Sequence, residues 1–179
     1  MRRTAVLSGL VLVGGLLGPS TAFADDQNGH HNNGKAQWIA VQDQFATVLP
    51  DGETFTGPDQ GPMNAAPPVG TQLLFSEVLY KTTDGVTKGD KVGRSHVQCT
   101  AQVVSFTFRC DGALVFDDGS ELFASVVLDF SATPKSFDIA VLGGTGHWFG
   151  ATGALTDTDI STAKQTVALY EADVVLPHE

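Results

Sequence analysis

A glutamate lies within a run of alternating apolar residues, where its carboxyl group has scope for acid–base chemistry. Glu77 follows Leu73 and Phe75 at intervals of two residues, and Leu79 continues the series. Because alternate residues of a β-strand share one face, this spacing predicts that Glu77 points to the same apolar side as these neighbours. A carboxyl group buried there needs a partner or takes up a proton, so Glu77 is a candidate catalytic residue.

Three further polar residues lie on expected strands. His96, Arg94 and Arg109 are candidates for an acid, a base or a hydrogen-bonding anchor in an apolar pocket, and His96 is the one taken as catalytic beside Glu77. The alternative is that they face solvent, because a closed sheet alternates inside and outside along every strand. The pattern alone leaves both orientations open for each of them.

Aromatic residues supply candidate ligand contacts. Phe75 shares the face of Glu77, while Tyr80, Trp148 and Phe149 are expected to line a pocket or its mouth. The alternative is ordinary packing in the core or at a subunit contact, which is the usual role of aromatic residues in β proteins.

The two cysteines of the chain, Cys99 and Cys110, enclose ten residues across an expected hairpin. In an oxidising compartment this arrangement predicts a structural disulfide, which stabilises the fold by roughly 2 to 3 kcal/mol on the loop-entropy model. A redox pair would favour a C-x-x-C spacing, and a zinc site with His96 would have three ligands and no close fourth. We therefore predict a disulfide and no metal site.

The elements that position these residues are expected to be β-strands, because the apolar pattern has a period of two and no helical period. Turn residues between most of the segments favour short reversals and hence antiparallel neighbours. Residues 50–69 contain five prolines and are expected to form a long loop, which either covers an opening or is disordered. The eight expected strands cover residues 37–48, 70–81, 91–101, 104–117, 121–131, 136–142, 150–158 and 164–176.

The amino terminus has the features of a secretory signal. Arg2 and Arg3 precede an apolar run too short to cross a bilayer, and small residues at 22 and 24 match a cleavage site. We predict a signal peptide over 1–24, a flexible polar leader over 25–36 and one domain over 37–179. After cleavage the protein is expected to be secreted and to have no membrane association.

Composition narrows the function classes. The formal net charge of −10 argues against binding to nucleic acid or anionic lipid, because both need clustered lysine and arginine side chains. The chain has no G-x-S-x-G elbow, H-E-x-x-H helix or P-loop, so the usual signals of serine hydrolases, zinc proteases and nucleotide-dependent enzymes are missing. The glycines at 143, 144 and 146 do not fit a dinucleotide fingerprint, since residue 149 is Phe, and they are expected to form a tight turn with positive φ and a bent strand.

The segment 141–153, V-L-G-G-T-G-H-W-F-G-A-T-G, resembles the signature V-x-G-G-T-G-x-F-x-G-A-x-G of the allene oxide cyclase and dirigent barrel superfamily. Residues 69–80 and 91–94 are similar to its second and third strands, and residues 99–119 resemble the middle hairpin of secreted bacterial members, the allene oxide cyclase barrel-like proteins.

This resemblance implies an eight-stranded antiparallel β-barrel, where period two alone leaves a sandwich open. It also implies a hydrophobic small molecule inside, no cofactor, and a homo-oligomer, which in plant relatives is often a trimer. Asp43 lies near an acidic pocket residue of dirigent proteins and is a third catalytic candidate. Thr152 stands where dirigent proteins usually have arginine, which argues against dirigent-type coupling.

The resulting prediction is a secreted barrel that encloses a hydrophobic small molecule. If it is an enzyme, it acts as a cofactor-independent cyclase or isomerase, or as a stereochemical guide, by holding the substrate in one conformation. The alternatives are a non-catalytic binding or interaction module on the same scaffold, and a structural domain whose barrel is packed solid.

Overall fold

A computed structural model of the protein describes residues 34–56, 66–132 and 135–177. The predicted signal peptide and residues 25–33 of the predicted leader lie outside these residues. The first strand begins at Gly34, three residues before the expected start at residue 37, so residues 34–36 belong to the sheet. Ala36 packs against the core, which gives this end of the strand apolar area to bury.

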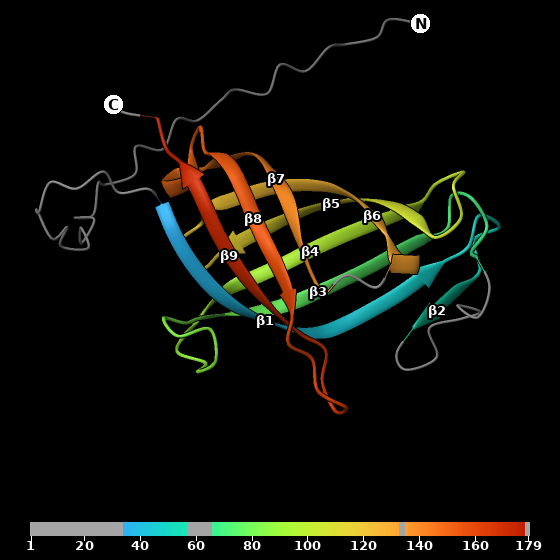
Figure 1. Ribbon diagram of the computed structural model, residues 1–179, viewed down its shortest axis with the longest axis horizontal. Coiled ribbons are helices and arrows are strands. Elements are labelled where there is room, and N and C mark those ends of the chain that lie inside the picture. The colour runs from blue at the N-terminus through green and yellow to red at the C-terminus, as the bar shows by residue number, and fades with distance from the viewer. Residues whose placement is uncertain (1–33, 57–65, 133–134, 178–179) are drawn as a thin grey trace, which may run out of the picture. The chain divides into compact units, whose positions relative to one another are not determined.

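The described chain forms one antiparallel sheet that closes on itself (Figure 1). Neighbouring strands follow the order β2-β1-β3-β4-β5-β6-β7-β8-β9, and β1 also pairs with β9. This confirms the predicted eight-stranded antiparallel barrel, with β2 as an extra strand on β1. The strands are β1 (Gly34–Val48), β2 (Thr54–Thr56), β3 (Gln72–Lys81), β4 (Lys91–Ala101), β5 (Thr107–Phe116), β6 (Glu121–Asp129), β7 (Ser136–Thr145), β8 (Thr152–Asp159) and β9 (Val167–Val175), with short 3-10 turns η1 (Phe130–Ala132) and η2 (Gly146–Trp148).

Strand β1 closes the barrel because different parts of it pair with different neighbours. Residues 34–41 pair with β9, residues 38–48 pair with β3, and residues 46–48 pair with β2. A bulge at Asp43 interrupts the register with β3. Such an extra residue bends a strand and increases its twist, as a strand shared between both edges of a closing sheet requires.

Two of the differences between expected and observed boundaries have local reasons. The strand expected from residue 104 begins at Thr107, because residues 102–106 form a turn in which Phe106 has a φ of 57°. The expected long loop after residue 50 contains β2, because Leu49 and Gly52 close a turn that returns the chain along β1. Both departures depend on turn geometry that an alternating pattern does not show.

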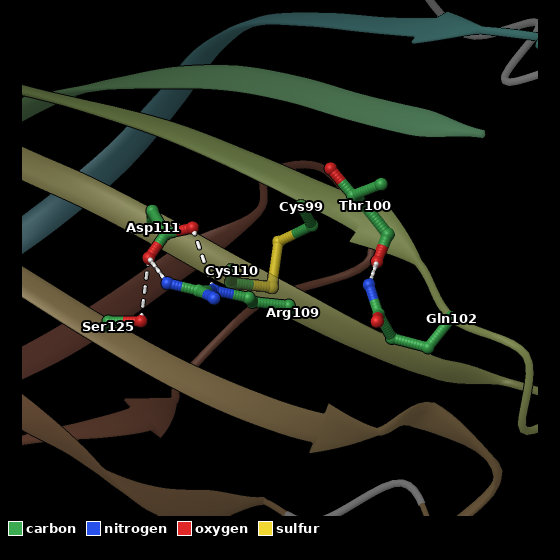
Figure 2. The surroundings of a disulfide bond; sticks show 7 residues. All are labelled: Cys99, Thr100, Gln102, Arg109, Cys110, Asp111 and Ser125. Carbon is green, nitrogen blue, oxygen red and sulfur yellow. Dashed lines mark hydrogen bonds and ion pairs between the residues drawn. A yellow bond between two sulfur atoms is a disulfide. The ribbon is translucent and has the colours of Figure 1, made fainter. Parts of the chain in front are cut away.

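Apolar side chains that point inward form two clusters along the barrel interior. One cluster lies towards the end that carries η2 and includes Trp38, Phe116 and Trp148. The other lies towards the opposite end and contains the disulfide between Cys99 and Cys110, which are register partners on β4 and β5 (Figure 2). The two sulfur atoms are 2.04 Å apart, which confirms the predicted disulfide.

Candidate functional site

Glu77 points into the barrel between the two apolar clusters. The residue is only 4% exposed, which confirms the predicted inward orientation of its side chain. Ser95 on β4 donates a hydrogen bond to Oε2 of Glu77 at 2.6 Å, and the Tyr170 hydroxyl on β9 donates to the same oxygen at 2.7 Å. Among the described residues no donor reaches the other carboxylate oxygen, Oε1. Glu77 therefore has one oxygen held by the protein and one available for further hydrogen bonding.

A second carboxyl group lies on the same interior face. Asp157 on β8 pairs with Tyr170 on β9, and directly opposite residues of two antiparallel strands share one side of the sheet. Tyr170 reaches Glu77 inside the barrel, so Asp157 also points inward. Within the described part of the chain, no hydrogen-bond partner of the Asp157 carboxyl group is found. Asp157 is half-buried, and an acid without a protein partner beside an apolar interior is costly to keep charged, which marks it as a functional candidate.

The surroundings favour the protonated forms of these groups. Burial raises the pKa of Asp157 from 3.8 to about 7, and the charges of Glu77 and Asp159 add to this effect. Burial also raises the pKa of Glu77, although the hydrogen bonds from Ser95 and Tyr170 act in the opposite direction. The pKa of Tyr170 is raised well above 10 by its burial, so its hydroxyl stays protonated. Since Glu77 and Asp157 interact, their protons titrate as those of a coupled pair.

This arrangement can move protons near neutral pH. Asp157 is close to half protonated at pH 7, where a group serves as both acid and base. The surrounding barrel surface is apolar, which strengthens hydrogen bonds and charges inside it. A neutral ligand with a carbonyl or hydroxyl group suits the site, whereas an anion would be repelled by the two carboxyl groups.

The barrel end next to this cluster is covered by three aromatic rings. The ring centroids of Trp38 and Phe116 are 5.3 Å apart, and the Trp148 ring lies 5.8 Å from each of them. Gly144 permits this arrangement, because a Cβ there would lie 2.5 Å from the Cβ of Trp148. The φ of Gly146, 56°, then turns the chain into η2. The glycine-rich segment therefore places Trp148 over the barrel end, with its positive-φ turn at 146 and not at 144.

A hollow of about 620 Å³ lies at this end, with the three rings in its wall (Figure 1 shows η2 beside the start of β1). A second hollow, of about 870 Å³, lies against the outer face of β1, β3, β4 and β5. Among the described residues that line these two hollows there is neither Glu77 nor Asp157. The acid cluster therefore does not line the end hollow.

The other two catalytic candidates lie outside the barrel. Asp43 is the extra residue of the β1 bulge, and both of its carboxylate oxygens accept hydrogen bonds from Arg94, at 2.6 and 2.7 Å. The Arg94 guanidinium lowers the pKa of Asp43. His96 follows the inward residue Ser95 and is exposed on the outer face. The sheet therefore lies between these two residues and Glu77, and the structure does not bring the three together.

The four aromatic candidates also separate. Phe75 faces inward and packs, half-buried, on the cluster around the disulfide. Tyr80 is three residues from Glu77 on the same strand, so its side chain points to the opposite, outer face. There the Lys88 ammonium group is 5.5 Å from the centroid of the Tyr80 ring. Phe149 is 74% exposed, and Trp148 is buried in the ring layer. Only Phe75 and Trp148 contribute to the barrel interior.

Sequence reasoning missed three members of the acid cluster: Ser95, Asp157 and Tyr170. Their parity was available, since Asp157 follows Leu155 by two residues and Tyr170 precedes Ala172 by two. Asp157 and Tyr170 therefore lie on an apolar face by the same argument that selected Glu77. Their meeting depends on the closure of β1 with β9, which no local pattern shows.

No group of three or more histidine, cysteine, aspartate or glutamate residues in the described part of the chain is arranged to hold a metal ion. None of the helical segments in the ranges that the structure covers has the length and apolar character needed to cross a bilayer.

The closed sheet and its interior acid cluster define a class of protein, the small antiparallel β-barrels with polar groups enclosed among apolar side chains. No protein-family model and no curated protein matches the sequence. Among solved structures, a pyocyanin demethylase is similar, with 24% identity, a TM-score of 0.56, and coverage of 79% of this chain and 99% of the other.

Two further structures share the fold. The pterocarpan synthase dirigent protein PsPTS1 is 16% identical with a TM-score of 0.55, and the match covers 81% of this chain and 96% of the other. AbnU, an exo-specific intermolecular Diels–Alderase, is 14% identical with a TM-score of 0.51, and covers 77% and 94%. These likenesses show the fold, which the chain shares with dirigent proteins. The resemblance to allene oxide cyclases stays a prediction.

Proposed function

We propose that the protein encloses an apolar small molecule with a carbonyl or hydroxyl group and transfers a proton to or from it at Asp157. The observation that carries this proposal is the Asp157 carboxyl group, which faces the apolar interior beside Glu77 without a hydrogen-bond partner among the described residues. A site of this kind acts as a cofactor-independent isomerase or cyclase.

The roles of the neighbouring residues follow from their hydrogen bonds. Glu77 holds the Tyr170 hydroxyl through Oε2, and its free Oε1 accepts a hydrogen bond from the ligand. Asp157 exchanges the proton, since its pKa of about 7 gives both protonation states at neutral pH. Phe75 and the apolar residues around the disulfide hold the remainder of the ligand.

The similar structures support this reading at the level of the scaffold. They are named for a demethylase, a pterocarpan synthase and a Diels–Alderase, and each of these acts on small organic molecules. The disulfide and the signal-like amino terminus support secretion, because disulfides persist in oxidising compartments.

A model reaction tests the proton transfer without knowledge of the natural substrate. The neutral aromatic 5-nitrobenzisoxazole is opened by removal of one proton, and its phenolate product absorbs visible light. We expect catalysis that rises with pH around a midpoint near 7, together with a loss of at least about tenfold in Asp157→Asn. Asp173→Asn, on the outer face of β9, is the matched control and is expected to keep the wild-type rate. An equal rate in Asp157→Asn, or no rate above that of acetate buffer, would contradict the proposal.

A non-catalytic binding module on the same scaffold is the second candidate. It is favoured by the end hollow, which the acid cluster does not line. Saturable binding of 2-naphthol that Asp157→Asn leaves unchanged would support binding in the end hollow, away from the acids. If the benzisoxazole reaction is absent at the same time, the binding function is the correct one.

A further inference from the structure

The barrel interior becomes accessible to solvent beside the acid cluster. On β1, Ala40 is completely buried, whereas Gln42, two residues further along the same face, is half-buried. The same change occurs on β8, from the buried Leu155 to the half-buried Asp157. Because alternate residues of a strand share one face, Gln42 and Asp157 both point inward. Their partial exposure indicates that the interior is open at this level.

The barrel wall has an incomplete ladder close to Asp157. Strands β6 and β7 are register partners only between residues 121–125 and 140–145, so among the described residues the segments 126–129 and 136–139 do not pair with each other. Phe137, the register partner of Asp157, lies in the second of these segments and is half-buried. A ligand can therefore approach Asp157 past Phe137 without breaking hydrogen bonds between strands.

Gln42 lies directly opposite Glu77. The two residues are register partners on β1 and β3, and side chains in such positions have Cβ atoms about 4.5 to 5.5 Å apart. Within the described part of the chain, the Gln42 amide group has no hydrogen-bond partner, and neither has Oε1 of Glu77 or the Asp157 carboxyl group. An amide offers two N–H donors, which an ionised carboxyl group lacks. Gln42 thus adds an unused donor to a site whose other unpaired groups are acids.

We propose that the Gln42 amide donates a hydrogen bond to the carbonyl oxygen of a neutral ketone, while Asp157 removes a proton from the carbon atom next to that carbonyl. This inference rests on the proposed function and names its substrate class, the β,γ-unsaturated ketones. The electron pair of the broken C–H bond forms the new C=C bond of a dienolate, and the negative charge moves to the oxygen that Gln42 holds. Asp157 then returns the proton to the γ-carbon, so the product is the conjugated ketone and no further reactant is consumed.

The isomerisation of 3-cyclohexenone tests this inference, because its conjugated product absorbs ultraviolet light. Gln42→Met keeps the length of the side chain but has no N–H donor. We expect this variant to lower kcat at least about tenfold with little change in KM, since the carbonyl oxygen gains its charge on the way to the transition state. Gln44→Met is the matched control, because Gln44 is exposed on the outer face of the same strand, and it is expected to keep the wild-type rate.

The outcomes separate this inference from the proposed function. If the wild type opens 5-nitrobenzisoxazole but does not isomerise 3-cyclohexenone, or if Gln42→Met isomerises it as fast as the wild type does, the role of Gln42 is overturned and proton transfer at Asp157 stands. If neither reaction is faster than in buffer, both proposals are overturned. An equal fall in kcat in Gln42→Met and Gln44→Met would also overturn the inference. Circular dichroism verifies that each variant is folded, and Gln42→Leu replaces Gln42→Met if the latter is not.

Discussion

Replacing Asp157 by asparagine should remove most of the loss of stability that the protein suffers between pH 4 and pH 8. In the unfolded chain this carboxyl group ionises near pH 3.8, whereas in the barrel its pKa is about 7. As the pH rises through this interval, the unfolded state gives up its proton and the folded state keeps it. The stability of the fold is therefore highest below the unfolded pKa and falls as the pH rises towards the folded pKa.

The magnitude follows from the two pKa values. The pKa differs between the folded and unfolded states by the interval from 3.8 to about 7. At roughly 1.36 kcal/mol per unit of pKa, the fold therefore loses about 4 kcal/mol of stability by the time the pH is above 7. Glu77 contributes in the same direction, because burial also raises its pKa. An asparagine at position 157 has no proton to lose, so the variant should retain only the dependence that comes from Glu77.

Exposed aspartates act in the opposite direction and in a different interval. Hydrogen bonds lower the pKa values of Asp43, Asp111, Asp118 and Asp159, so their stabilisation is present above pH 3.8 and is lost at lower pH. An assay restricted to pH 4.5–8.5 therefore isolates the contribution of the interior acids.

Urea unfolding, followed by tryptophan fluorescence at several pH values, measures this contribution. Both tryptophans are buried in the folded barrel, so their emission reports unfolding. Part of the total of about 4 kcal/mol is already lost at pH 4.5, and the wild type is expected to lose the remainder between pH 4.5 and 8.5. Over the same interval, Asp157→Asn is expected to lose much less stability. Asp173→Asn, an exposed control on β9, should follow the wild type. The reasoning is refuted if Asp157→Asn loses as much stability with pH as the wild type does.

Three further predictions concern the scaffold. Replacing both Cys99 and Cys110 by alanine should lower the free energy of unfolding by about 3 kcal/mol, because the bridge closes a loop of sequence separation 11; an unchanged urea midpoint would contradict this. Gly144→Ala should cost about 1 to 3 kcal/mol and alter the Trp148 emission, because the new Cβ has no space beside that residue; wild-type stability and emission would show that the contact is not needed. Arg94→Gln should cost less than about 1 kcal/mol, and 1 M salt should reduce the difference, because the ion pair is about one-third exposed; a larger cost that is insensitive to salt would disprove it.

The retention of two interior acids has a consequence for function. A barrel selected only for stability would hold apolar residues at positions 77 and 157, since buried acids lower stability at neutral pH. Residues that break a local rule of stability are commonly found at functional sites. The acid cluster is therefore the best place to look for the chemistry of this protein.

Much of the fold could be predicted from the sequence, because strands and turns are specified by local patterns. The alternation of Leu73, Phe75 and Glu77 showed both the strand and the face on which the carboxyl group lies. The spacing of Cys99 and Cys110 across a short reversal predicted the disulfide. Where turn geometry decided, as with Phe106, the predicted boundary was several residues away from the observed one.

The composition of the site was decided by tertiary structure. Asp43 and Glu77 are both acidic residues on expected strands, but the bulge at Asp43 turns one carboxylate to Arg94 on the outside, while Glu77 faces the interior. Tyr170 lies 93 positions from Glu77 and reaches it only because β1 pairs with both β3 and β9. Local alternation determines which side chains share a face, since it repeats every two residues. Which of these faces meet inside the barrel depends on how the sheet closes, and closure is a property of the whole chain.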